Sequence, residues 1–245
     1  MKRKWMKGIF LPLLVILIMS CLLPGNLAEA KSKTKVSYKK VTETKTWKAD
    51  DGTILVRAAY KGIKIKGSSS AAKKMNKVWE KEKNQFFKTA AEAKESAQSA
   101  YENLSSYNTF DTTQFSISSK VTFNKKGIIS MKEKYSEYYS GAIHGYYYTY
   151  GHTFKISSGK ELKFNQVVSG TNKTDKKKLV AAFKKMYNEK PDRYFENAVD
   201  TVRAKSVKKQ AFYLSGKNAV ACYAPYDLSY YAAGETFVKV RHRYN

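Results

Sequence analysis

Three histidines, His144, His152 and His242, are the side chains best suited to bind a metal ion or to transfer a proton near neutral pH. A zinc site needs further ligands at suitable spacing, but the sequence has no HExxH motif and no paired cysteines. On an extended strand His144 and His152 would lie about 26 Å apart, unless a bend at a nearby glycine shortened that distance. The sequence therefore predicts no metal site and no cofactor. The alternative role for His144 is that of a hinge residue whose ring binds the backbone.

Carboxylates are the second group that could do chemistry. A glycosidase uses two carboxyl groups about 5 to 9.5 Å apart, and the acidic residues near aromatic residues are Glu133, Glu137, Asp227 and Glu235. Local sequence sets no pair of them apart, and charged side chains normally stay on the surface. No GxSxG motif supports a serine nucleophile. We therefore assign no catalytic residue and expect a protein that is not an enzyme.

A run of tyrosines is the third candidate feature. On a strand, Tyr146, Tyr148 and Tyr150 would face one way and Tyr147 the other. An exposed row of rings can stack on sugars or anchor a protein partner, although tyrosine is also an ordinary strand former. With the basic run discussed next, the candidate ligand-binding residues are His144, Tyr146, Tyr148, Tyr150, Tyr226, Tyr230, Lys176, Lys177 and Lys178.

The charge of the chain favours anionic partners. It has 46 Lys and Arg against 20 Asp and Glu, a formal net charge of +26. Such a field attracts polyanions, and Lys176, Lys177 and Lys178 belong to one basic patch, although a merely solubilising surface is the alternative. Outside a bacterial membrane the abundant polyanions are phosphate-bearing wall polymers and anionic lipid headgroups, so peripheral membrane contact is one possible outcome. The sequence contains no recognised nucleic-acid-binding module, so we expect no nucleic acid partner.

The N-terminus has the features of a secretory signal peptide. Basic residues precede an apolar run at Ile9–Leu23, which is shorter than the roughly 18 residues expected of a membrane-spanning helix. Ala28 and Ala30 match the small residues that a signal peptidase recognises. We expect cleavage after Ala30, a secreted product that can associate with the cell wall, and no transmembrane segment in the mature chain. Lipoprotein anchoring at Cys21 is less favoured, because bulky apolar residues surround it.

Cleavage after Ala30 has two consequences for the mature chain. It removes four of the 46 basic and one of the 20 acidic residues, which leaves a net charge of +23. It also leaves Cys222 as a single thiol, which cannot form an internal disulfide. Apolar neighbours at alternate positions predict that Cys222 is a buried, structural residue on a strand.

These residues need a scaffold of strands and helices. Residues 31–40 read as a flexible basic arm, and strand-like sequence follows near Val41 and over Thr53–Lys66. Apolar residues at helical spacing predict one long helix over residues 71–104, packed across a sheet.

The remaining elements complete the predicted fold class. Phe115, Ile117, Val121 and Phe123 alternate with polar residues, which predicts one buried strand face and a hairpin with the segment containing Ile129. A second hairpin, shorter helices over residues 174–189 and 194–205, and strands around residues 212, 220 and 238 follow. The predicted fold is α+β, with antiparallel sheets.

Three segments resemble a known domain pair. The sequences SGAIHGYYYTYG at Ser140–Gly151, FKISSGKEL at Phe154–Leu162 and APYDLSYYAAG at Ala224–Gly234 resemble motifs of DUF4163 followed by DUF3298, a pair found in exported bacterial envelope proteins. The resemblance implies a DUF4163-like domain over residues 41–139 and a DUF3298-like domain over residues 140–245. The family joint usually reads Gly-Gly-Ala-His-Gly, whereas here Ser140 replaces the first glycine and Ile143 precedes the histidine.

The resemblance also suggests partners. Characterised proteins with this pair include an anti-sigma factor whose exported part binds lysozyme, and proteins that carry a peptidoglycan deacetylase domain. This sequence has eight residues before its apolar run and shows no deacetylase sequence, so neither activity transfers directly.

Three hypotheses follow. The first is a secreted, non-catalytic envelope protein that binds an anionic wall polymer or a glycan. The second is a lysozyme-binding protein without sigma-factor signalling, although the net charge opposes contact with a cationic lysozyme unless a local acidic patch exists. The third is an accessory factor of a wall hydrolase or deacetylase.

Overall fold

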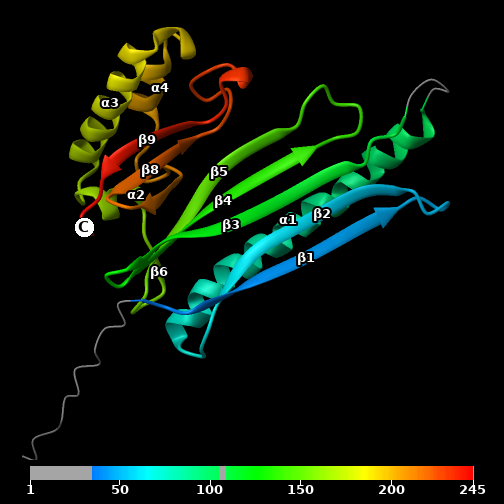
Figure 1. The fold of residues 1–245 in the computed structure, drawn as a ribbon, viewed down its shortest axis with the longest axis horizontal. Helices are drawn as coiled ribbons and strands as arrows, with labels where there is room; N and C mark the ends of the chain where they lie inside the picture. The colour runs from blue at the N-terminus through cyan, green and yellow to red at the C-terminus, as the bar shows by residue number, and fades with distance from the viewer. Residues whose placement is uncertain (1–34, 105–108, 245) are drawn as a thin grey trace, which may run out of the picture. The chain divides into compact units, whose positions relative to one another are not determined.

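The structure, a computed structural model, describes residues 35–104 and 109–244. It contains a six-stranded sheet in the order β1-β2-β3-β4-β5-β6 and a three-stranded sheet in the order β7-β8-β9 (Figure 1). The strands are β1 (Tyr38–Lys48), β2 (Ile54–Ile65), β3 (Thr113–Lys125), β4 (Ile128–Tyr138), β5 (Tyr146–Lys155), β6 (Lys160–Glu161), β7 (Phe212–Ser215), β8 (Asn218–Tyr223) and β9 (Thr236–Arg241). The helices are α1 (Ser70–Glu102), α2 (Phe164–Val168), α3 (Asn172–Glu189) and α4 (Ala198–Ala204). This content confirms the predicted α+β class.

The expected basic arm is partly a strand. Residues 38–40 belong to β1 and pair with the end of β2. The preceding Val36 is also fixed, because its N–H donates to Asn124 Oδ1 at 3.0 Å and its carbonyl accepts from Asn124 Nδ2 at 2.8 Å. The exposed lysines and threonines of β1 suit an edge strand with one solvent-exposed face. The rest of the arm before residue 35, the expected cleavage site at Ala28 and Ala30, and Cys21 lie outside the described residues.

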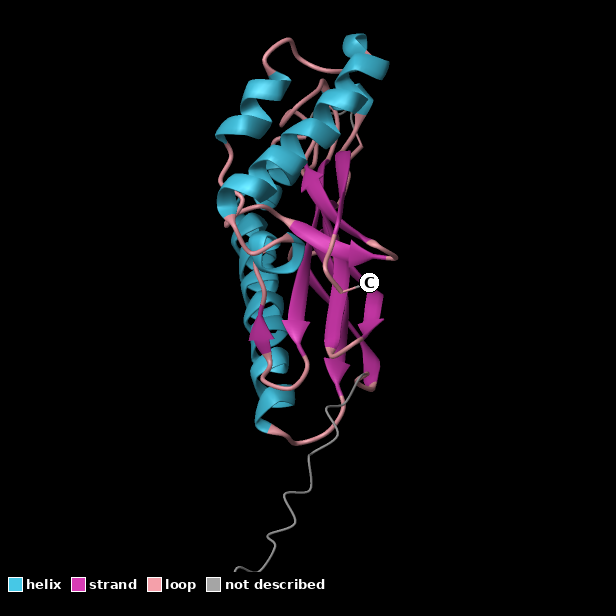
Figure 2. Ribbon diagram, turned by 90° about the vertical axis from the view of Figure 1, so that its left-hand side faces the viewer, coloured by secondary structure: helices cyan, strands magenta, loops and turns pink. Residues whose placement is uncertain are grey.

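Helix α1 connects two parallel strands. β2 and β3 pair in parallel, and a parallel pair needs a long crossover connection, which α1 supplies. Ser69 caps the helix by accepting a hydrogen bond from the Ala72 N–H at 3.2 Å. The buried stripe includes Met75, Trp79 and Phe86, which pack on the sheet as the spacing predicted. Figure 2 shows the long helix lying along the strands.

A β-bulge in β3 corrects one expectation about the first hairpin. Val121 lies opposite Met131 but Phe123 lies opposite Ser130, so Thr122 is an extra residue in β3. The extra residue turns Phe123 away from the α1 face and into the core beneath the second sheet. The prediction that Phe123 shares a face with Val121 was therefore wrong, although the hairpin itself is confirmed.

The second sheet packs on the face of the first sheet that lies opposite α1. The Leu214 N–H of β7 donates to Ser130 Oγ at 2.9 Å, and Ser130 also pairs with Thr153 Oγ1 at 2.7 Å. At Gly151 the backbones approach so closely that an added Cβ would lie 2.6 Å from the Phe212 carbonyl oxygen. Glycine is required there because any side chain would push the two sheets apart.

The expected domain boundary falls between paired strands. Residues 139 and 140 lie in the connection between β4 and β5, which are antiparallel neighbours from Ile128↔Lys155 to Glu137↔Tyr146. Residues on both sides of that boundary therefore share one sheet.

The C-terminal segment has its own core between β7–β9 and helices α2–α4. Phe164, Leu179, Phe183 and Val202 are fully buried there. Cys222 is 2% exposed on β8, as its apolar neighbours predicted. The helix expected over residues 194–205 is shorter, because the backbone is extended at Tyr194 and α4 begins only at Ala198. No helix within residues 35–104 and 109–244 is both long and apolar enough to cross a bilayer.

Candidate functional site

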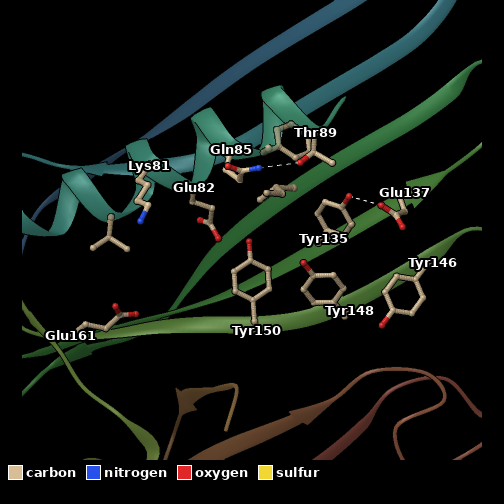
Figure 3. A pocket seen from close by; sticks show the side chains of 13 residues that line it. Lys81, Glu82, Gln85, Thr89, Tyr135, Glu137, Tyr146, Tyr148, Tyr150 and Glu161 are labelled. Carbon is tan, nitrogen blue, oxygen red and sulfur yellow. Dashed lines mark hydrogen bonds between the residues drawn. The ribbon is translucent and has the colours of Figure 1, made fainter. Parts of the chain in front are cut away.

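A groove runs between α1 and strand β5. Helix α1 lies mainly over β2, so the α1 face of β4 and β5 is only partly covered. The resulting cavity has a volume of about 780 Å³ (Figure 3). It is lined by Val78, Lys81, Glu82, Gln85, Phe86, Thr89, Ile117, Tyr135, Glu137, Tyr146, Tyr148, Tyr150 and Glu161. We call this cavity the tyrosine groove.

The tyrosine row forms one wall of the groove. The ring centroids of Tyr146 and Tyr148 are 5.9 Å apart, and those of Tyr148 and Tyr150 are 5.6 Å apart. Tyr135 of β4 adds a fourth ring, 5.0 Å from Tyr148. Tyr147 points to the opposite face, where Lys134 lies 4.6 Å from its ring centroid. The alternation predicted from the sequence is therefore confirmed, and the row that faces α1 lines the tyrosine groove.

The groove is acidic although the chain is strongly basic. Its charged lining consists of Glu82, Glu137 and Glu161 against the single lysine Lys81. The Tyr135 hydroxyl donates to Glu137 Oε2 at 2.5 Å, which fixes both groups on the groove wall. Burial, and then the hydrogen bond to Glu137, raise the pKa of Tyr135 far above its ordinary value. The phenols therefore stay neutral, and the groove suits neutral or cationic groups rather than polyanions.

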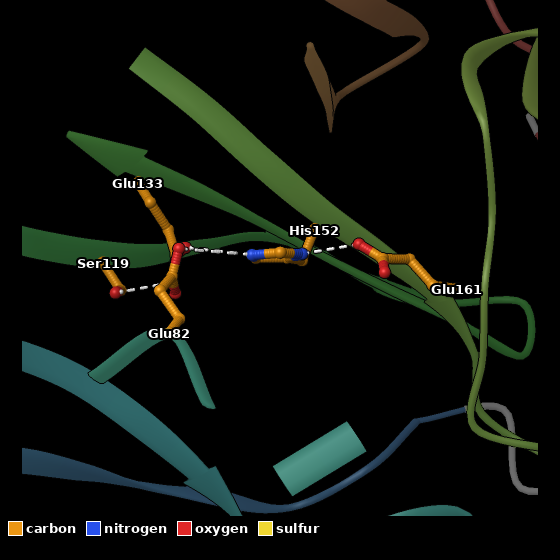
Figure 4. Close-up of polar contacts among 5 residues, drawn as sticks. All are labelled: Glu82, Ser119, Glu133, His152 and Glu161. Atoms are coloured by element: carbon orange, nitrogen blue, oxygen red, sulfur yellow. Dashed lines mark hydrogen bonds and ion pairs between the residues drawn. The ribbon is translucent and has the colours of Figure 1, made fainter. Parts of the chain in front are cut away.

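One end of the groove holds a cluster of two carboxylates and an imidazole. Glu82 comes from α1, Glu133 from β4 and His152 from β5 (Figure 4). His152 Nε2 lies 3.4 Å from Glu133 Oε2 and 3.5 Å from Glu82 Oε1. Glu133 is 0% exposed, so the expectation that it lies on the solvated surface was wrong. We call these three residues the Glu–Glu–His cluster.

Neighbouring side chains hold the cluster in place. Glu161 of β6 accepts a hydrogen bond from His152 Nδ1 at 2.5 Å. Ser119 lies directly opposite Glu133 in the β3–β4 pairing and donates to Glu133 Oε1 at 2.8 Å. The rings of Trp79 and Phe154 flank the imidazole at centroid distances of 6.5 and 6.0 Å. Each member of the cluster is therefore oriented by a specific contact.

Burial and mutual charge set the protonation of the cluster. Burial, and then the charge of Glu82, raise the pKa of Glu133 to about 8. Burial alone would lower the pKa of His152, but hydrogen bonds to Glu161 and Glu82 and the nearby carboxylate charges raise it to about 10. Burial opposes ionisation of Glu82 as well, yet the hydrogen bond and charge of His152 keep its pKa below the ordinary value. At neutral pH the cluster thus pairs an imidazolium with an ionised Glu82, and Glu133 retains a proton.

The remaining predicted site residues lie elsewhere. His144 is exposed and stacks on Tyr231 at 3.9 Å, and its Nδ1 lies 3.0 Å from the Gly145 carbonyl oxygen. This backbone contact is the one expected of a hinge residue. Tyr226 also lies beside Tyr231, with ring centroids 5.7 Å apart, and neither Tyr226 nor His144 lines the tyrosine groove.

The other predicted binding residues belong to the C-terminal segment. Tyr230 is 65% exposed and packs edge-on against Phe195. Lys176 of α3 donates to the carbonyl oxygens of Arg203 and Lys205 at the end of α4, so it is part of the helix packing. Lys177 and Lys178 are exposed on α3. The structure thus separates the basic patch from the tyrosine row.

Sequence reasoning missed Glu82, His152 and Glu161 as partners. One signal was available for Glu133. Ile129, Met131 and Tyr135 alternate along one strand face, and Glu133 occupies the position between Met131 and Tyr135 on that same face. The meeting of Glu82 with β4 depends on how α1 lies over the sheet, for which the sequence gives no local signal.

Comparisons with known proteins give structural relatives only. No protein-family model and no curated protein matches the sequence. A solved DUF3298 family protein from Bacteroides fragilis is similar with a TM-score of 0.59 and 15% identity, over 86% of this chain and 92% of that chain. One from Pseudomonas aeruginosa is similar with a TM-score of 0.56 and 11% identity, over 84% and 90% of the two chains. The chain therefore has the fold of these solved DUF3298 family proteins.

Proposed function

We propose that this protein is an exported envelope protein that binds a glycan in the tyrosine groove. The observation that carries the proposal is the row of Tyr146, Tyr148 and Tyr150, whose rings face an open cavity at near-regular spacing. Aromatic faces pack on the apolar faces of sugar rings. Glu137 and Gln85 provide hydrogen-bonding groups for sugar hydroxyls on the same walls.

The groove favours a neutral or amino-sugar glycan over a phosphate-bearing polymer. Three carboxylates line it against one lysine, so a polyanion would meet like charge there. The exposed Lys177 and Lys178 lie on α3, in the layer behind β7–β9. We infer that the surface containing Lys177 and Lys178 holds the protein at an anionic wall, while the tyrosine groove binds the glycan.

We infer binding without turnover. The two carboxylates of the Glu–Glu–His cluster have ligand atoms within 4.8 Å of each other, a spacing comparable with that of a retaining glycosidase pair. Glu133 is 0% exposed, however, and does not line the groove. A sugar in the groove cannot reach this carboxylate unless neighbouring side chains move.

The fold supports placing the chain among DUF3298 relatives. That residues 41–139 are a DUF4163-like part is our proposal from the sequence motifs. Export follows from the signal peptide predicted for residues 1–30, and mass spectrometry of the protein from culture medium tests it. A mature N-terminus at Lys31 is expected. Retention of residues 1–30 would contradict this part of the proposal.

The binding test uses residues 31–245 and a tetrasaccharide prepared from purified peptidoglycan. We expect one binding site by titration calorimetry, and at least about tenfold weaker binding by the Tyr148→Ala variant, a loss of about 1.4 kcal/mol. Tyr230→Ala is the matched control, because Tyr230 is exposed outside the groove. No binding by the wild type, or equal losses in both variants, would reject the groove as the site.

The acidic groove also favours lysozyme as a second candidate. It provides the local acidic patch that a cationic lysozyme would need on a basic protein. Glu137→Gln should weaken a lysozyme complex, and added salt should weaken it further by screening. Tetrasaccharide binding should be nearly independent of salt, which separates the two candidates.

A further inference from the structure

The Glu–Glu–His cluster has the dimensions of a metal site. The two distances from His152 Nε2 to carboxylate oxygens, 3.4 and 3.5 Å, are longer than good hydrogen bonds. They match the edge of a tetrahedron, about 3.4 Å, around a zinc ion with bonds of about 2.1 Å. The three ligand atoms of Glu82, Glu133 and His152 all lie within 4.8 Å of one another. Side-chain adjustments alone would bring all three into contact with one ion.

Two buried carboxylate oxygens of the cluster have no hydrogen-bond partner. Glu133 Oε2, on a side chain with 0% exposure, has no hydrogen-bond partner and faces His152 Nε2. The second oxygen of Glu82, Oε2, is also buried without a hydrogen-bond partner. Burying carboxylate oxygens without partners is costly. A divalent ion would pair with both carboxylates, and its binding would release the protons that Glu133 and the imidazolium of His152 hold without it.

The surroundings are those of a prepared site. Glu161 accepts the Nδ1 proton of His152, which leaves Nε2 as the nitrogen that faces the carboxylates. Ser119 holds the other oxygen of Glu133. Carboxylates on ligating histidines, and hydrogen bonds to ligating carboxylates, are the usual outer contacts of protein-bound zinc. The two residues that make these contacts, Glu161 of β6 and Ser119 of β3, are not themselves ligands in this site.

We propose that Glu82, Glu133 and His152 bind one zinc ion at the end of the tyrosine groove. Glu82 lines the groove and also belongs to the cluster, so the ion would lie next to the groove. One imidazole and two carboxylates form a ligand set that zinc accepts. The ion would tie α1 to β4 and β5 and offer a coordination position to a ligand in the groove. This site is independent of the glycan proposal.

The test uses residues 31–245 without a histidine tag, after treatment with a chelator. We expect one zinc per chain by titration calorimetry and by elemental analysis. We also expect the zinc-bound chain to unfold at a higher temperature than the zinc-free chain. His152→Gln and Glu133→Gln should each weaken binding by at least about 100-fold, and Glu161→Gln by about 10- to 100-fold. His144→Gln is the matched control, because His144 is exposed and outside the cluster, and it should bind like the wild type.

A second measurement needs no variant and remains decisive if a substitution prevents folding. Zinc added to the wild type should shift the imidazole NMR signals of His152 and leave those of His144 unchanged. Unchanged His152 signals, absence of one-to-one binding, or equal weakening in His144→Gln would overturn the proposal. Preference for calcium or magnesium over zinc would also overturn it. Loss of zinc binding with intact tetrasaccharide binding would leave the glycan proposal standing, so the two can fail separately.

Discussion

Glu133 of β4 and Tyr150 of β5 lie directly opposite each other in the sheet, so a fully buried carboxylate lies beside the last tyrosine of the row. Burial, and then the charges of Glu133 and Glu82, raise the pKa of the Tyr150 hydroxyl well above its ordinary value. The groove wall and the Glu–Glu–His cluster are therefore one connected unit, and a change in either should affect the other.

Removing the buried carboxylate should destabilise the metal-free fold. Glu133→Ala leaves Ser119 and His152 without their partner inside the core. We expect a loss of about 3 kcal/mol in the free energy of unfolding, the range for breaking a buried pair. Urea denaturation with a chelator present measures it. Glu92→Ala, on the exposed side of α1, should change stability by less than about 0.5 kcal/mol. Similar small effects in both variants would show that Glu133 is not a structural partner.

Gly151 should tolerate no side chain. An added Cβ would lie 2.3 Å from the Met131 carbonyl oxygen and 2.6 Å from that of Phe212, and both are backbone atoms. Gly151→Ala should therefore cost about 2 to 3 kcal/mol, as overpacked positions do. At Gly216 an added Cβ meets nothing within 4 Å and only the φ of +56° opposes it. Gly216→Ala should cost about 1 kcal/mol. Thermal unfolding of both variants checks this order, and the reverse order would contradict the packing of the two sheets.

His242 should make the fold less stable in mild acid. Its Nε2 lies 3.1 Å from the Gly216 carbonyl oxygen, and its Nδ1 accepts the Tyr244 N–H at 3.0 Å. This pattern requires a neutral ring, and burial lowers the pKa of His242 below 6.5. The unfolded chain therefore binds more protons below pH 6.5, so stability falls as the pH falls, by at most about 1.4 kcal/mol per pH unit.

The His242→Asn variant isolates that effect. Asparagine can accept the Tyr244 N–H without taking up a proton. The free energy of unfolding, measured from pH 7.5 to 5.0, should decline less steeply in this variant than in the wild type. Parallel curves would mean that His242 does not contribute to the pH dependence.

The buried thiol of Cys222 should be unreactive. Cys222 is 2% exposed, and burial followed by the charge of Glu235 raises the pKa of its thiol to about 12. Because the thiolate is the reactive form, a thiol reagent at pH 8 should label the native protein very slowly. The same protein in denaturant should be labelled completely. Rapid labelling of the native protein would show that β8 opens readily.

The exposed lysines of α3 should contribute to wall retention and not to groove binding. Replacing Lys177 and Lys178 by serine removes two charges from one exposed surface. Retention on purified wall at low salt should decrease, while the affinity for the tetrasaccharide should stay within about twofold, because long-range attraction acts mainly on encounter. Equal losses of both would show that the lysine surface and the groove form one site.

Several features were predictable from the sequence for clear physical reasons. The spacing of Met75, Trp79 and Phe86 predicted α1, since a helix of that length needs a continuous apolar stripe. The alternation of Tyr146 and Tyr147 followed from the period of a strand. Both are local rules, and the structure confirms both.

Other features depend on contacts between distant segments. The extra residue Thr122 in β3 moves the side chain of Phe123 to the other face of the sheet. The alternation of residues along a strand cannot predict such a bulge. The parallel pairing of β2 with β3 places α1 across the sheet and brings Glu82 to His152. Glu133 is the exception: it was predicted to lie at the surface, although the alternation of its strand was a local signal for the buried face.

The β2–α1–β3 crossover also constrains the order of assembly. As the chain emerges from its N-terminus, α1 is complete well before β5 and β6 exist. Glu82 can contact His152 and Glu161 only after about seventy to eighty further residues have been synthesised. Contacts between residues so far apart in the sequence form slowly. The contacts of the Glu–Glu–His cluster are therefore among the last to form in the large sheet. A chain that ends before residue 161 would lack the contact between His152 and Glu161 that orients the imidazole toward α1.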